Sequence, residues 1–117
     1  MVALHRGANF MLENPLQSLI YFHPRLRKFL KKRGHTEQMT WLGMYGAKTW
    51  KPVKLVSSSK EVQRLYRKLN KKKFGKSGST RQYRSASGKL CFQGVPGKLC
   101  ETEVYPPEFG RAVLQLQ

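Results

Sequence analysis

The stretch NFMLENPLQSLIYFHPRLRKFLKKRG, Asn9 to Gly34, decides the fold that the sequence predicts. Its apolar beginning, Asn9–Leu12, is typical of a short buried strand. The acidic-polar segment Glu13–Pro15 has the chemistry of a turn that starts a helix, with Asn14 as the N-cap and proline at the first helical position. We therefore expect a strand, a turn and then a helix over Pro15–Arg33.

The expected helix has one apolar side that contains a proline. The residues at helical spacing on this side are Leu16, Leu19, Ile20, His23, Leu26 and Leu30. Because Pro24 lacks an amide hydrogen and clashes with the preceding turn, it should kink or split the helix near Phe22-His23. Lysines and Arg33 in the last turns suit the helix dipole, and Gly34 is a natural stop.

Two further apolar segments, Met39–Tyr45 and Val53–Val56, are typical of strands. With Asn9–Leu12 they predict one sheet of parallel strands, on which the helix Pro15–Arg33 packs. The expected fold class is α/β, a small partial Rossmann-like sheet in a single domain of 117 residues. Within it we distinguish a core (1–56), a basic helix, loop and hairpin (57–104) and a C-terminal helix (105–117).

A basic amphipathic helix is expected after the third strand. Ser58 and Glu61 match a capping box, and apolar residues recur at helical spacing over Val62–Leu69, with basic residues on the other face. The lysine- and glycine-rich segment Asn70–Ser79 is expected to be a loop.

A hairpin and a short helix are expected to end the chain. Thr80–Arg84 and Lys89–Gln93 are separated by the turn sequence Ser85–Gly88, which predicts antiparallel pairing. The helix follows Tyr105-Pro106, and its expected buried face consists of Phe109, Ala112, Val113 and Leu116.

Positive charge dominates the composition. Lysine and arginine number 23 against six acids, no aspartate is present, and the formal net charge is +17. The positive electrostatic field of such a chain favours binding of phosphate polyanions, whereas a surface that serves only solubility normally carries both positive and negative residues. We expect a nucleic-acid partner, DNA before RNA. The expected contact residues are basic side chains and one interleaved tryptophan: Lys48, Trp50, Lys51, Arg64, Arg67, Lys68, Lys71, Lys72, Lys73, Lys76, Arg81 and Arg84.

Residue types and spacings argue against several other sites. Without aspartate there is no Asp-based triad and no Asp-ligated magnesium. Cys91 and Cys100 lack CxxC spacing, so no metal site is expected. Gly75–Ser77 matches the end of a phosphate-binding loop, but Asn70 stands where that pattern needs its first glycine. We interpret this segment as a basic loop.

The sequence also bears on location. It contains no run of about 20 apolar residues, the length of a membrane span, and its first residues do not form a secretory signal. Two cysteines do not make a disulfide framework. We expect an intracellular protein, in the nucleus or in an organelle.

The order of three short motifs carries a family resemblance. The chain resembles the middle of a DNA cytosine-C5 methyltransferase domain in three places, which are Leu12–Pro15 (LENP), then Tyr45-Gly46, then Lys51. That family has Glu-Asn-Val and, after a helix and a strand, Tyr-Gly-x-Pro-Gln-x-Arg-x-Arg. Lys51 stands where the first arginine would be, and Thr49 and Val53 depart from the glutamine and second arginine. The Glu-Asn-Pro version is similar to methyltransferase-like segments in protist mobile-element open reading frames.

The resemblance, which covers residues 9–56, implies specific roles. Glu13, with Asn14, would contact a base edge, and the third strand would be antiparallel in its sheet. The family's glycine-rich cofactor turn and Pro-Cys nucleophile are absent before Glu13. We therefore expect no methylation by this chain alone, and S-adenosylmethionine only if a partner protein supplies the missing half of the fold.

Two other functions remain open from the sequence. A lysine-rich chain without aspartate and with basic glycine-containing loops also fits a structural RNA-binding protein of a ribosome-like particle. A binder of anionic membranes would need an exposed apolar face beside lysines, for which Val62–Leu69 is the candidate. Glu13 has an alternative role too, as a carboxylate that stabilises the start of a helix.

Overall fold

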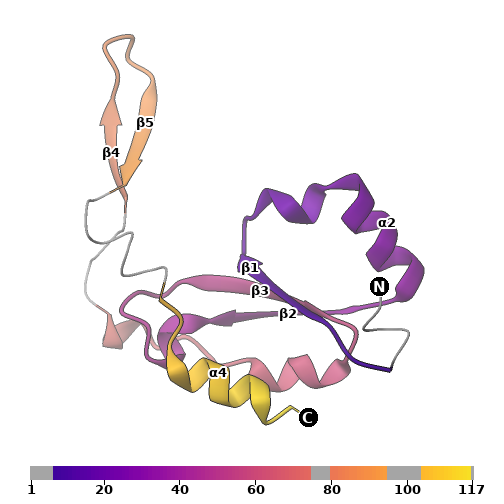
Figure 1. The fold of residues 1–117 in the computed structure, drawn as a ribbon. Coiled ribbons are helices and arrows are strands. Elements are labelled where there is room, and N and C mark those ends of the chain that lie inside the picture. The colour runs from indigo at the N-terminus through magenta and orange to yellow at the C-terminus, as the bar shows by residue number, and fades with distance from the viewer. Residues whose placement is uncertain (1–6, 75–79, 95–103, 117) are drawn as a thin grey trace.

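The computed structural model describes residues 7–74, 80–94 and 104–116. Three strands form one sheet in the order β1-β3-β2: β1 (Met11–Pro15), β2 (Thr36–Trp41) and β3 (Pro52–Ser57). The three expected strand segments do meet in one sheet, and the fold is mixed α/β (Figure 1).

The expectation of parallel pairing is wrong, because β3 lies between the other two strands and is antiparallel to both. Residues 42–51 return the chain directly from β2 into β3, and a connection this short reverses the strand direction. As a consequence β1 and β2 have the same direction but are not hydrogen-bonded to each other.

The first strand was expected over Asn9–Leu12, but it begins at Met11 and includes the whole acidic-polar segment. Glu13 pairs with Leu55 and Asn14 pairs with Lys54 across β1 and β3. Asn14 therefore does not cap a helix, and Pro15 ends an edge strand, where a missing amide hydrogen is tolerated.

Pro24 splits the expected helix, as predicted. A 3-10 turn, η1 (Leu19–Phe22), is capped by Ser18, and α2 (Pro24–Arg33) then begins with Pro24 at its first position and His23 as the N-cap residue. The apolar stripe is buried only at its end. Leu30 is buried, whereas Leu19 is 82% exposed.

The expected strand Met39–Tyr45 is divided in the structure. β2 ends at Trp41, and the rest forms a buried 3-10 turn, η2 (Leu42–Tyr45), which ends at Gly46 with a φ of 100°. The third strand agrees with the prediction.

Both faces of the sheet are covered, and the larger core lies on one of them. α2 lies on one side of the sheet, while α4 (Pro107–Leu114) and the 3-10 turn η3 (Lys60–Leu65) lie on the other (Figure 1). The core on the α4 side consists of Leu42, Tyr45, Val53, Leu55, Val62, Leu65 and Phe109. Full burial of one such side chain stabilises the fold by about 1.5–3 kcal/mol.

The basic helix after β3 is shorter than predicted, and its cap differs. Ser59, not Ser58, accepts the amide hydrogen of Glu61, at 3.2 Å. The helix ends at Leu65 because the Leu65 carbonyl oxygen accepts hydrogen bonds from the hydroxyls of Thr40 (2.8 Å) and Tyr45 (2.5 Å). The chain leaves helical conformation at the next residue.

The hairpin and the last helix are confirmed. β4 (Thr80–Arg84) pairs with β5 (Leu90–Gly94), and the connecting turn places Gly88 at a φ of 78°. In α4, Phe109 is buried, and the other expected residues pack against the core. The hairpin projects away from the sheet and both helices (Figure 1). The radius of gyration is accordingly 17.0 Å, whereas a compact chain of this length would have about 13 Å.

Candidate nucleic-acid interface

Glu13 lies on β1, on the face of the sheet that α4 covers. Its Oε2 accepts a hydrogen bond from the hydroxyl of Tyr105, which precedes α4. Its Oε1 is shielded from solvent and has no hydrogen-bond partner among the described residues. Because Glu13 is within a strand, its alternative role at a helix start is wrong. The base contact remains a prediction.

Two tyrosines near Glu13 have raised pKa values. Burial, the hydrogen bond to Glu13 and the charge of that carboxylate raise the pKa of Tyr105 to about 12. Burial and the charge of Glu13 likewise raise the pKa of Tyr21 to about 12. The Tyr21 hydroxyl donates to the Lys54 carbonyl oxygen at 2.7 Å. Both phenols therefore remain hydrogen-bond donors at neutral pH.

Lys51 connects the Glu13–Tyr105 pair to the basic loop before β3. Its ammonium lies 4.9 Å from the centre of the Tyr105 ring. Lys51 also has a φ of 38°, in the left-handed region that few residues other than glycine adopt. Such unfavourable conformations are often retained at functional sites.

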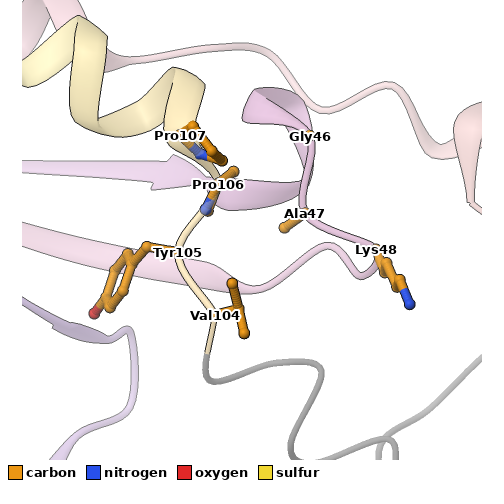
Figure 2. A pocket seen from close by; sticks show the side chains of 7 residues that line it. All are labelled: Gly46, Ala47, Lys48, Val104, Tyr105, Pro106 and Pro107. Carbon is orange, nitrogen blue, oxygen red and sulfur yellow. The ribbon is translucent and has the colours of Figure 1, made fainter.

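A cavity of about 300 Å³ lies beside this contact. Its walls are Gly46–Lys48 from the loop after η2 and Val104–Pro107 from the segment that leads into α4. Tyr105 and Lys48 point to opposite sides, with Ala47 and Val104 between them (Figure 2).

A second basic segment approaches the same loop. The Lys71 ammonium lies 5.5 Å from the centre of the Trp50 ring. The Phe74 ring packs so closely on Gly43 that a Cβ there would be 2.6 Å from it. This contact holds the short 3-10 turn η4 (Lys71–Lys73) beside the loop that carries the expected contact residues Lys48, Trp50 and Lys51. Trp50 is exposed, as expected for a surface aromatic.

Other expected contact residues have partners within the protein. The Arg67 guanidinium lies 3.8 Å from the centre of the Tyr45 ring and forms a 2.6 Å ion pair with Glu108. Arg64 pairs with Glu61 at 3.1 Å. These two arginines therefore have structural contacts that the sequence did not reveal.

The remaining expected residues are more scattered. Lys72 and Lys73 belong to η4 and are exposed, as is Lys68. Arg81 and Arg84 are exposed on the hairpin, where they bond to Gln93 and the Gly88 carbonyl oxygen. Lys76, Cys100 and the segment Gly75–Ser77 lie outside the described residues.

The sequence interpretation missed two features of the charged groups. Tyr105 was not expected to contact Glu13, because 92 positions separate them. The interpretation also did not single out α2, which lies on the side of the sheet opposite α4 (Figure 1), has no acid and carries Arg25, Arg27, Lys28, Lys31, Lys32 and Arg33. The absence of any acid from this helix was the available signal.

Most of the described glutamates are paired with cations. The Lys54 ammonium, 2.6 Å from Glu37, lowers the pKa of that carboxyl, and His35 lowers it further. The hydrogen bond and charge of Arg67 lower the pKa of Glu108. These ion pairs involve few of the 23 basic residues, so the net charge of the protein remains strongly positive.

Comparison with known proteins finds no matching family model, no matching curated protein and no matching solved structure. In residues 7–74, 80–94 and 104–116, no helix has the length and apolar character needed to cross a membrane. The same ranges contain no cluster of three or more histidine, cysteine or acidic side chains suited to a metal ion.

Proposed function

We propose that this chain binds nucleic acid, and DNA in particular, through the basic surface around Trp50. The observation that carries the proposal is the convergence of two lysine-containing segments. The loop with Lys48 and Lys51 and the turn Lys71–Lys73 lie together, joined by the Lys71–Trp50 contact of 5.5 Å. Lysines there would hold phosphates, and the exposed tryptophan would contact a sugar or base.

Glu13 would take part by accepting a hydrogen bond from a base edge. Cytosine presents an amino donor that carboxylates accept. The Tyr105 hydroxyl occupies Oε2 in the structure, so the segment Val104–Pro107 must move before a base can reach that oxygen. Lys51, which contacts the Tyr105 ring, would couple this movement to phosphate binding.

We further propose that the sheet is methyltransferase-like and does not methylate alone. The antiparallel position of β3 between β1 and β2 supports this, since the resemblance implies an antiparallel third strand. A partner protein that completes a Rossmann-like sheet would pair with the outer edge of β1. Only that partner would supply an S-adenosylmethionine site. The nucleus is the compartment that fits such a DNA-bound assembly.

The alternative function is that of a structural RNA-binding protein in a ribosome-like particle. The projecting β4–β5 hairpin favours it, because an extended basic arm can reach into a folded RNA (Figure 1).

Fluorescence anisotropy with labelled DNA and RNA duplexes, titrated with salt, tests the proposal. Each lysine–phosphate contact on B-DNA contributes about 0.9 to the slope of log affinity against log salt. The variant K71Q/K72Q/K73Q should therefore reduce that slope by up to about 2.7. The matched control K31Q/K32Q/R33Q, which removes three charges from α2, should reduce the slope less. If both variants reduce the salt slope equally, the interface is not the surface around Trp50. Negligible affinity of the unmodified protein at low salt would refute nucleic-acid binding.

A further inference from the structure

Each face of the β4–β5 hairpin carries one aromatic ring and one arginine, and the more exposed ring is Phe92. Pairing of Gln82 with Phe92 and of Arg84 with Leu90 places these four side chains on one face, since alternate residues of a strand share a face. The other face carries Tyr83 opposite Cys91, and Arg81 bonded to Gln93 at 3.2 Å.

The face with Phe92 exposes apolar groups that a soluble hairpin would normally cover. Phe92 is 62% exposed and Leu90 is 47% exposed, whereas the opposite face has a single large exposed hydrophobic residue, Tyr83, at 48%. Among the residues that the structure describes, no helix or other strand lies over the hairpin (Figure 1). Large exposed apolar groups gathered on one face are typical of a binding surface.

Charge indicates which partner this face fits. The segment Thr80–Gly94 has Arg81, Arg84 and Lys89 but no acid. Arg84 is held by a 3.0 Å hydrogen bond to the Gly88 carbonyl oxygen, which fixes it at the turn on the same face as Phe92. A flat aromatic ring beside a fixed guanidinium complements a base and its phosphate.

The ring also indicates that the bases are unpaired. A phenyl group cannot hydrogen-bond to a groove edge, and stacking on the face of a base is the contact with nucleic acid that covers its ring. In a duplex these faces are covered by the neighbouring base pairs, whereas in single strands and loops they are available for stacking.

We propose that the face formed by Gln82, Arg84, Leu90 and Phe92 binds unpaired nucleotides, with a base stacked on Phe92 and a phosphate on Arg84. The inference rests on the proposed nucleic-acid function and adds to it the class of substrate. The surface around Trp50 would supply the contacts to phosphates, and the hairpin would select single-stranded segments.

The test compares a fluorescein-labelled single-stranded oligothymidine, an oligouridine of the same length and a duplex DNA. The variant F92A should weaken single-strand binding about tenfold, the scale of one lost base–aromatic stack, and leave duplex binding and the salt dependence unchanged. F92W, which keeps an aromatic face, should retain affinity. R84Q should make the salt slope shallower by about 0.7 on single strands.

Two controls separate stacking from other effects. L114A removes an exposed side chain of α4 and should leave all affinities unchanged. Y83A shortens a residue on the opposite face of the hairpin and should weaken single-strand binding less than F92A does. Equal losses for Y83A and F92A would overturn the inference, because the effect would then reflect hairpin stability.

The remaining outcomes distinguish the inference from the proposed function. If unmodified protein binds both oligonucleotides and F92A binds equally well, the stacking face is wrong and the proposed function survives. If F92A weakens duplex and single strand alike, selection of unpaired bases is wrong. If the unmodified protein binds none of the probes, both proposals fail. A preference between the thymidine and uridine strands would identify DNA or RNA as the source.

Discussion

The Tyr105 hydroxyl donates a hydrogen bond to Glu13 Oε2, and so joins the segment before α4 to the middle of β1. Replacement Y105F should remove this bond, which frees Oε2 to accept another donor and loosens the segment before α4, at a cost of about 1 kcal/mol in the free energy of unfolding. If Tyr105 blocks access of a base to Glu13, Y105F should also tighten binding to oligocytidine. Urea unfolding and anisotropy measure the two effects. Looser binding in a fully folded Y105F would show that Tyr105 contacts the nucleic acid itself.

Replacement E13Q should reveal whether the carboxylate recognises a base. A neutral amide accepts a weaker hydrogen bond than a carboxylate does, so the preference for oligocytidine over oligothymidine should shrink. Total affinity for duplex DNA should remain unchanged. E61Q is the matched control, because Glu61 pairs with Arg64 on the surface. If E13Q leaves base preference intact, Glu13 has only a structural role.

Stability should fall at high pH as the two tyrosines ionise. Their pKa values are raised from 10.0 to about 12 in the folded protein. The unfolded chain therefore loses these protons first, and the stabilisation is complete below pH 10 and lost as pH rises toward 12. Urea unfolding followed across this range should show a decline that is smaller in the double variant Y21F/Y105F. An identical decline in that variant would assign the effect to other groups.

Replacement G43A should damage both the fold and the interface. A Cβ at Gly43 would lie 2.6 Å from the Phe74 ring and 2.6 Å from the Thr49 carbonyl oxygen. Relief of such overpacking typically costs about 1–3 kcal/mol, and movement of Phe74 would carry Lys71–Lys73 away from Trp50. DNA affinity should drop with the free energy of unfolding. The control G110A has open space around its Cβ and should be neutral or stabilise α4 by up to about 1 kcal/mol.

Replacement T40V should destabilise the protein without unfolding it. Thr40 is fully buried and donates to the Leu65 carbonyl oxygen at 2.8 Å, but Tyr45 donates to the same oxygen. The single loss should therefore cost about 1–2 kcal/mol, and the double variant T40V/Y45F should cost more than the sum, because the carbonyl is then unpaired. Chemical denaturation of the two single variants and the double variant measures these costs. If the two single losses simply add up in the double variant, the two hydroxyls do not compensate for each other at the Leu65 carbonyl oxygen.

Local chemistry in the sequence predicted several elements well. Pro24 cannot lie inside a helix, and it does divide the segment as expected. The turn residues Ser85–Gly88 likewise predict the hairpin, whose second strand was expected at Lys89–Gln93 and forms at Leu90–Gly94. These features depend on contacts between near neighbours, which a sequence displays directly.

The errors arise where distant residues decide the conformation. Asn14 and Pro15 can start a helix or end an edge strand, and only pairing with β3 selects the strand. The helix after Ser59 stops because two hydroxyls from β2 and η2 occupy the Leu65 carbonyl. The partner of Glu13 comes from the end of the chain. The spacing of apolar residues along the sequence does not predict such contacts.

The ion pairs of Glu37, Glu61 and Glu108 have a consequence for the energetics of the whole molecule. Most described carboxylates are already paired, and the net charge is +17. Folding brings the positive charges closer together, and their mutual repulsion destabilises the folded state. A bound polyanion would reduce this repulsion and so raise the free energy of unfolding. Part of that gain would come from basic residues that do not contact a phosphate.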